Sequence, residues 1–261
     1  MLCLHGARKR SFDAMKKKHA PYLHISPTRE KAVLMIHGIC STPRHFDFLV
    51  SSLPGEVTVH ALLLEGHGGT VKDFTNASMK KWRADMANAL TALEADHREI
   101  YIVGYSMGTL LALEALEAHP KIKGLLLLNP PFRPWVRWEM AKRSYRFAKG
   151  RVDWEQPHET ACQESIGVEL TSTLVKYAGW IPRFLELLLL CRRARRRKNP
   201  ISVPCKVFLG VKDELVSLRS EKYLTAQENV EIRISHEAGH FYYSDSDKAW
   251  MIEALKDFTV S

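Results

Sequence analysis

The stretch "VGYSMGT" (residues 103–109) places a serine between two glycines, after an apolar run and before a run of helix-forming residues. Its Gly104-x-Ser106-x-Gly108 spacing matches the nucleophile elbow G-x-S-x-G. In such an elbow the serine occupies a strained turn between a strand and a helix, and small neighbours let the backbone turn that sharply. A close-packed strand–helix corner without chemistry is the alternative. We interpret Ser106 as a nucleophile, because a buried structural serine needs no flanking glycines.

Apolar runs alternate with helical patterns on both sides of this stretch. The predicted strands are 32–38, 57–64, 100–106, 122–130, 205–211 and 230–235, and the predicted helices are 44–53, 79–96, 107–119, 220–227 and 247–258. Strands that are apolar throughout and separated by helices indicate a parallel sheet covered on both faces. The expected fold is therefore α/β, with a doubly wound, mostly parallel sheet.

This rhythm is interrupted between residues 131 and 200. The segment is rich in Trp, Arg and Lys and is mostly helical in pattern, which predicts a helical cap (131–200) inserted between two core strands. Residues 1–130 and 201–261 then form the core. Six cap aromatics could roof a pocket, and we expect most of them to form the cap's own small core: Trp135, Trp138, Phe147, Trp154, Trp180 and Phe184.

A serine hydroxyl needs a base to act as a nucleophile at neutral pH. In proteins with this elbow, an acid and then a histidine follow the serine along the chain. Asp213 in "GVKDELV" and His240 in "EAGHFYY" each follow a predicted strand, and the carboxyl ends of parallel strands meet at one edge. We predict that His240 takes the serine proton and that Asp213 fixes its tautomer. Glu214 and His236 are the alternatives for these two roles.

An oxyanion hole requires two backbone N–H donors. One is expected from Met107, the residue after the nucleophile, and the other from Ile39 in the loop after the strand "AVLMIHG". For His37, at the start of this loop, we favour a role in bracing the loop over a role in catalysis.

Five motifs together resemble the α/β-hydrolase superfamily, and most of all its small carboxylesterase and bacterial monoacylglycerol lipase branch. They are "HGICSTPRHFDFL", "EGHGGT", "GYSMGT", "GVKDELV" and "EAGH". The resemblance covers about 30–130 and 200–260, so residues 1–130 and 201–261 are expected to form an α/β-hydrolase core. Ile39 replaces the aromatic residue that is usual in the branch, and Tyr105 also departs from its elbow. These departures bear on substrate preference more than on mechanism.

The resemblance implies a serine hydrolase that cleaves carboxylic esters through an acyl-enzyme and needs no cofactor. Monoacylglycerols and short to medium acyl esters are the expected substrates. A thioesterase, acyltransferase or peptidase with the same triad remains open, as does a non-catalytic hydrolase-fold binding protein. In the family the "EGHGGT" loop (65–70) borders the active site, although a glycine-rich turn with His67 on the surface is an equal alternative. No metal is expected, because the cysteines and histidines lack ligand spacing.

The formal net charge is +9, and much of it lies in the first 20 residues and in "RRARRRK" (192–198). A leucine run precedes the second cluster, so 184–198 could contact an anionic membrane surface. We favour a cap helix that ends in solvated arginines. No nucleic-acid-binding module accompanies the charge. No apolar run reaches about 20 residues, and the N-terminus lacks a secretory pattern. A cytoplasmic protein is expected, with peripheral membrane contact and oligomeric state left open.

Overall fold

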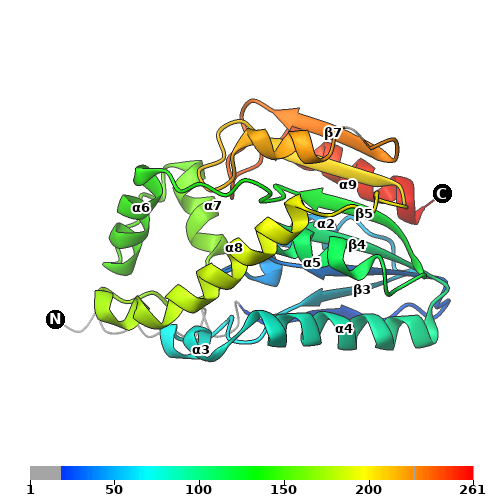
Figure 1. Ribbon diagram of the computed structural model, residues 1–261, viewed down its shortest axis with the longest axis horizontal. Helices are drawn as coiled ribbons and strands as arrows, with labels where there is room; N and C mark the ends of the chain where they lie inside the picture. Colours follow the sequence, from blue (N-terminus) through cyan, green and yellow to red (C-terminus); the bar gives the residue numbers. More distant parts are fainter. Residues whose placement is uncertain (1–18, 226, 261) are drawn as a thin grey trace.

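The computed structural model describes residues 19–225 and 227–260, so Cys3 and most of the basic N-terminal stretch lie outside the described residues. Seven strands of this part form one sheet in the order β1-β3-β2-β4-β5-β6-β7 (Figure 1). They are β1 (Tyr22–His24), β2 (Lys31–Ile36), β3 (Val57–Leu62), β4 (Glu99–Tyr105), β5 (Ile122–Leu128), β6 (Cys205–Gly210) and β7 (Val230–Ser235). Only the β1–β3 pair is antiparallel. The predicted doubly wound, mostly parallel sheet is confirmed.

All six predicted strands are found, with ends within two residues of the predicted ones. The edge strand β1 was not predicted. Its three residues are exposed or half-buried, and so short a segment carries no readable alternation.

The helices agree with the sequence pattern where they are long. They are η1 (Pro43–Phe46), α2 (Asp47–Val50), α3 (Val71–Asn76), α4 (Met79–Asp96), α5 (Met107–Ala115), α6 (Trp138–Ala148), α7 (Pro157–Ser165), η2 (Leu174–Trp180), α8 (Ile181–Arg195), η3 (Leu218–Tyr223) and α9 (Asp245–Thr259). Helix α4 begins after Ser78, whose hydroxyl accepts a hydrogen bond from Lys81 N–H. The predicted helix 44–53 was wrong in form: a 3₁₀ turn and one α-turn replace it. The 220–227 helix is likewise the 3₁₀ helix η3. The unpredicted α3 begins with a capping box of Thr70 and Asp73.

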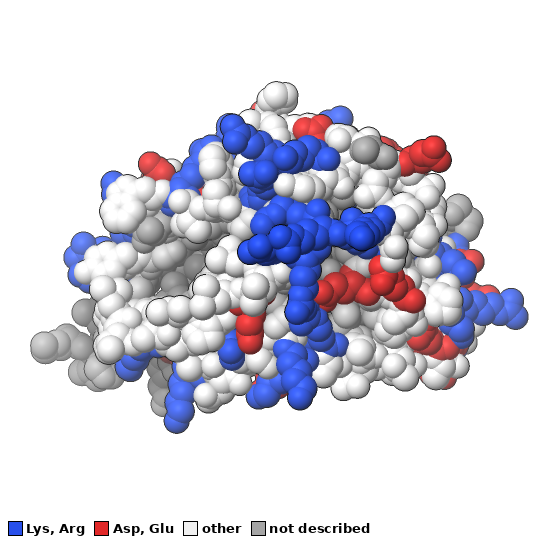
Figure 2. Space-filling model, in the orientation of Figure 1, with Lys and Arg blue, Asp and Glu red and all other residues white. Residues whose placement is uncertain are grey.

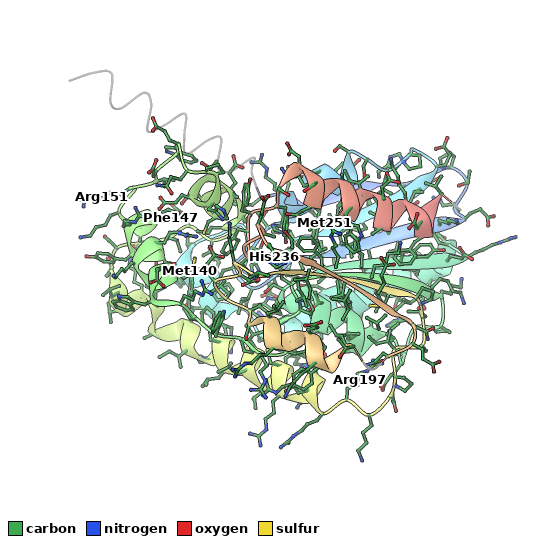
Figure 3. All side chains as sticks on the ribbon, turned by 90° about the horizontal axis from the view of Figure 1, so that it is seen from above. Met140, Phe147, Arg151, Arg197, His236 and Met251 are labelled. Atoms are coloured by element: carbon green, nitrogen blue, oxygen red, sulfur yellow. The ribbon has the colours of Figure 1, made fainter. Side chains whose placement is uncertain are left out.

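Apolar side chains cover both faces of the sheet. Along β2, Leu34 and Ile36 belong to one core cluster and Val33 and Met35 to the other, as the alternation of a strand requires. Helices α4, α5 and α8 pack on the first face, and α2 and α9 on the second (Figure 1). Figure 3 shows Met251 of α9 in this second layer. Loops at the carboxyl ends of the strands are therefore held between two packed layers.

The segment 131–200, here called the cap segment, connects β5 to β6 and contains α6, α7, η2 and α8. Its own core is small and includes Met140 and Phe147, which lie together on α6 (Figure 3), and Cys162. The expectation that most cap aromatics fill this core was wrong. Trp135, Trp138 and Trp154 are 44%, 68% and 61% exposed. Helices α6 and α8 flank a pocket, which is lined by Tyr145 of α6 and Phe184 of α8, and of the six aromatics only Phe147 belongs to the cap's own core.

The close approach of α5 to β2 can be tested at Gly108. A Cβ at this position would lie 1.9 Å from the carbonyl oxygen of Ile36, so Gly108→Ala should lower the free energy of unfolding by about 3 kcal/mol or more. Gly55→Ala is the matched control, because a Cβ there meets no atom within 4 Å. Urea unfolding followed by circular dichroism measures both. Equal stabilities of the two variants would contradict the packing described.

Candidate active site

Ser106 occupies a strained corner between β4 and α5. Its φ of 50° and ψ of −119° are rare for a residue with a side chain, and such geometry costs about 1–3 kcal/mol. The corner is held by Ser106 N–H, which donates to Leu128 O at 2.8 Å, and by Ser106 O, which accepts from Thr109 N–H at 3.0 Å. A Cβ on Gly104 would lie 2.7 Å from Thr109 Cα. The glycines therefore give the corner the room that the sequence pattern implied.

Asp213 and His240 form a buried pair. His240 Nδ1 lies 2.8 Å from Asp213 Oδ2, and each residue is 2% exposed. The other carboxylate oxygen accepts from the N–H groups of Leu215 and Val216 at 2.7 and 2.6 Å. Because an ionised carboxylate only accepts hydrogen bonds, Nδ1 is the donor and Nε2 carries the free lone pair. This is the tautomer that a general base requires.

Ser106 is connected to this pair through its neighbour in the chain and not by a hydrogen bond of its own. Its neighbour Tyr105 donates its hydroxyl to His240 O at 3.0 Å, and the two rings are 5.1 Å apart. Among the described residues, no hydrogen bond joins Ser106 Oγ to His240 Nε2. The structure thus unites Asp213 with His240, and Tyr105, the residue before Ser106, contacts His240. In free enzymes such a contact often tightens only when substrate binds.

The predicted oxyanion loop lies against the serine. A Cβ on Gly38 would be 2.9 Å from Ser106 Cβ, so the backbone before Ile39 passes directly beside Ser106. Met107 opens α5, where the first N–H groups have no partner within the helix. Within residues 19–225 and 227–260, neither Ile39 N–H nor Met107 N–H has a protein acceptor. Both amides are free to donate to a ligand.

Two buried histidines hold this loop. His37 Nδ1 donates to Gly38 O at 2.8 Å, and its Nε2 accepts from Leu64 N–H at 3.1 Å. His67 Nε2 accepts from Cys40 N–H at 3.0 Å. Burial lowers the pKa of His37 to about 4 and that of His67 well below its ordinary value, so both rings are neutral acceptors. The alternative of a surface His67 was wrong: it is 6% exposed and supports the loop.

Glu214 and His236, the rivals of Asp213 and His240, have other surroundings. His236 is exposed. Glu214 Oε2 accepts the backbone N–H of His240 at 2.9 Å, and Oε1 pairs with Arg143 of α6 at 2.9 Å. Burial raises the pKa of Glu214, but these hydrogen bonds and the Arg143 charge outweigh it and lower the pKa below its ordinary value. Glu214 therefore positions the backbone of His240 and ties it to the cap segment.

Sequence reasoning assigned no role to Asn129, His45 or Tyr243. Asn129 Oδ1 accepts from Gly210 N–H at 3.1 Å and its Nδ2 donates to Gly239 O at 3.3 Å, so it joins the loops that follow β5, β6 and β7. His45 stacks on Tyr105 with ring centroids 3.6 Å apart and contacts Tyr243 Oη at 3.1 Å. Of these three roles, only that of Asn129 has a signal in the sequence, because a polar residue ends the apolar run "LLLLN".

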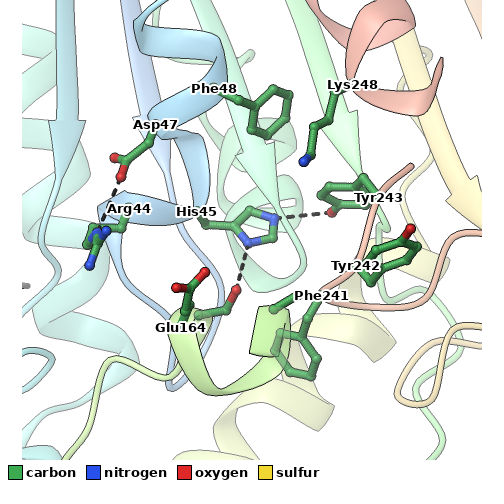
Figure 4. A pocket seen from close by; sticks show the side chains of 11 residues that line it. Arg44, His45, Asp47, Phe48, Glu164, Phe241, Tyr242, Tyr243 and Lys248 are labelled. Atoms are coloured by element: carbon green, nitrogen blue, oxygen red, sulfur yellow. Dashed lines mark hydrogen bonds and ion pairs between the residues drawn. The ribbon is translucent and has the colours of Figure 1, made fainter. Parts of the chain in front are cut away.

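Two pockets flank Phe241, the residue after His240. The larger has a volume of about 390 Å³, within the usual range for ligand sites. Its lining is mainly apolar and includes Ile39, Met140, Leu170, Trp180, Phe184 and Leu215. The smaller pocket, of about 230 Å³, is lined mostly by polar groups around His45 and Tyr243 (Figure 4). Because Ile39 lines the larger pocket, this pocket opens beside the predicted oxyanion donor.

Comparison with known proteins identifies the family of the chain. A family model described as "Alpha/beta hydrolase family" matches residues 33–254. The chain is 25% identical to the thermostable monoacylglycerol lipase of Bacillus sp. (strain H-257) over 87% of this chain and 89% of that protein. It is 31% identical to the pimeloyl-[acyl-carrier protein] methyl ester esterase of Stenotrophomonas maltophilia (strain R551-3) over 63% of this chain. The match spans only 55% of that relative's length.

Solved structures show the same fold. One reported with the metagenome-derived lipolytic enzymes LipS and LipT has a TM-score of 0.70 at 18% identity, covering 92% of this chain and 97% of that chain. Ferulic-acid-bound Est1E from Butyrivibrio proteoclasticus gives 0.61 at 19% identity, covering 92% and 94%. The chain belongs to the alpha/beta hydrolase family. It is a hydrolase-type enzyme with esterase and lipase relatives.

The role of Glu214 predicts a pH-dependent stability. A carboxyl whose pKa is lowered by folding adds stability above its unfolded pKa, and this stability is lost as the pH falls through the folded value. Glu214→Gln should therefore cost about 2 kcal/mol near neutral pH, and the difference from the parent should shrink in acid. Thermal unfolding over a pH series measures this. Glu253→Gln, on the exposed side of α9, is the control. A pH-independent difference would contradict the ion pair.

Proposed function

We propose that the protein hydrolyses carboxylic esters through Ser106, His240 and Asp213. The observation that carries this proposal is the buried contact of 2.8 Å between His240 Nδ1 and Asp213 Oδ2, beside the strained Ser106 corner. A histidine held in this tautomer has Nε2 available for a serine proton. The names of the two relatives, a methyl ester esterase and a monoacylglycerol lipase, both indicate action on carboxylic esters.

The proposed reaction uses these groups in two stages. Ser106 Oγ attacks the ester carbonyl carbon while its proton passes to His240 Nε2. The resulting oxyanion accepts from the N–H groups of Ile39 and Met107, and each such donor contributes roughly 3 kcal/mol to barrier lowering. The carbon–oxygen bond to the alcohol then breaks as His240 protonates the departing oxygen, leaving the acyl group on Ser106. Water, deprotonated by His240, releases the acid and restores the serine.

The larger pocket supports an aliphatic acyl group as the bound part of the substrate. Its apolar lining favours hydrocarbon over charged groups, and Ile39 links it to the oxyanion position. A monoacylglycerol or a short to medium acyl ester fits this description. A thioester, or transfer of the acyl group to an acceptor other than water, would use the same residues and is distinguished by an acyl and acceptor panel.

The triad is tested by substitution. Ser106→Ala should abolish labelling by a fluorophosphonate and lower kcat on p-nitrophenyl butyrate by about 10⁶-fold, and Asp213→Asn should lower it by about 10⁴-fold. Ser51→Ala, a change at an exposed serine outside the proposed site, should alter neither the labelling nor kcat. A folded parent protein that is not labelled and hydrolyses no ester would contradict the proposal.

The acyl pocket is tested by filling it. Ala148 of α6 lines the larger pocket, so Ala148→Phe should lower kcat/KM for a p-nitrophenyl decanoate by about tenfold or more. The kcat/KM for p-nitrophenyl acetate should not change, because its short acyl group does not reach Ala148. Ala161→Phe makes the same change in the smaller pocket and should spare both esters. Equal loss on the two esters in Ala148→Phe would count against acyl binding in this pocket.

A further inference from the structure

Helix α8 presents an apolar stripe to solvent. Five of its side chains recur at helical spacing and are between 41% and 59% exposed: Ile181, Phe184, Leu185, Leu188 and Leu189. The opposite side of the helix buries Leu187 and Leu190 in the main core. Packing in the core therefore accounts for only two of the five leucines of α8. Single exposed leucines are ordinary, but a contiguous stripe of this kind marks an interaction surface.

The stripe continues into positive charge. Arg192 and Arg196 follow Leu188 and Leu189 at the spacing of the same helical face, and both are exposed. Figure 2 shows an uncharged band over the N-terminal part of α8 and a dense group of Lys and Arg over its C-terminal end. An apolar face bordered by arginines is complementary to a surface that is apolar inside and anionic outside.

Helix α6 presents a second stripe of matching character. Trp138 and Tyr145 are 68% and 45% exposed. Lys142 Nζ lies 5.6 Å from the ring centre of Trp138, and Lys149 Nζ lies 4.5 Å from that of Tyr145. Aromatic rings beside lysines suit the boundary between hydrocarbon and headgroups, where the ring body is buried and the ammonium stays in water.

The two stripes meet at the mouth of the larger pocket. Four side chains both line this pocket and are at least 41% exposed: Val136, Tyr145, Leu174 and Phe184. In Figure 2 the surface is hollowed between α6 and α8. These four side chains thus connect the outside of the cap segment with the pocket. An acyl chain could pass along them without crossing water.

We infer that this face of the cap segment docks on a lipid bilayer that carries anionic headgroups. The structure extends the membrane contact considered for 184–198 to a surface built by α6, η2 and α8 around the pocket mouth. Charge decides against a second copy of the chain as the occupant, because each copy has a formal charge of +9 and would bring like charges together. None of the described helices has the length and apolar character needed to cross the bilayer, so the contact is peripheral. Delivery of lipid esters to Ser106 rests on the proposed function, whereas docking does not.

The full chain with Ser106→Ala is the form to test, because it leaves vesicle lipids intact. Its sedimentation with phosphatidylcholine vesicles should increase when phosphatidylglycerol is included. Adding Leu185→Gln and Leu189→Gln should reduce the partition coefficient by at least about tenfold. Leu23→Gln is the control, since Leu23 is 55% exposed on the edge strand β1, and it should bind as before.

The charged part of the surface is tested separately. Arg192→Gln with Arg196→Gln should weaken binding to anionic vesicles by about 20-fold or more and should have little effect on neutral ones. Lys80→Gln with Arg98→Gln removes the same charge from other exposed positions and should have a much smaller effect. Equal losses in the two double variants, or no loss in either, would overturn the proposal.

Two further readings separate this proposal from its alternatives. If light scattering shows that the Leu185/Leu189 variant converts a dimer into a monomer, the face is a self-association surface and membrane docking is overturned. Docking of Ser106→Ala together with an inactive parent would overturn only the ester hydrolysis. A parent protein that hydrolyses esters but binds none of the vesicles would overturn only the docking.

Discussion

The backbone corner at Ser106 is the constraint on which the site depends. A residue with a side chain at a φ of 50° is unfavourable by itself, and it persists because α5 is pressed against β2 and β4. Gly108 lies so close to Ile36 O that no other residue fits. This contact fixes the start of α5, which places Met107 N–H beside the serine and brings the Gly38 loop against it. One close approach of helix to sheet therefore sets both the proposed nucleophile and its surroundings.

Around this corner the protein buries polar groups that are paired within the fold. His37 and His67 are neutral rings whose hydrogen bonds hold the Ile39 loop, and Asn129 joins the loops that carry Asp213 and His240. Leaving any of these groups unpaired in the interior would be costly, so the loops have few alternative arrangements. The groups of the proposed site are thus held before a substrate arrives, which is the condition for electrostatic stabilisation of an oxyanion.

The sequence predicted the sheet and the pairing of Asp213 with His240. It did not predict the hydrogen bonds that hold the surrounding loops. Uninterrupted apolar runs are strong signals, and chain order after the elbow pointed to both residues. His67 binds Cys40 N–H across 27 positions, and Arg143 reaches Glu214 across 71. No local pattern encodes such contacts. The sequence also did not show which side of α8 is buried. When leucines occur on all sides of a helix, their periodicity does not distinguish the buried side from the exposed one.

The Arg143–Glu214 pair couples the cap segment to the histidine. Arg143 belongs to α6, which lines the larger pocket, and Glu214 accepts the backbone N–H of His240. A movement of α6 that separated the pair would leave a largely buried carboxylate facing His240 without its cation, at a cost of several kcal/mol. Opening the pocket by displacing α6 is therefore disfavoured by the same contact that positions His240. Entry along the apolar surface between α6 and α8 requires no such separation, which makes the proposed lipid-facing mouth consistent with a rigidly held His240.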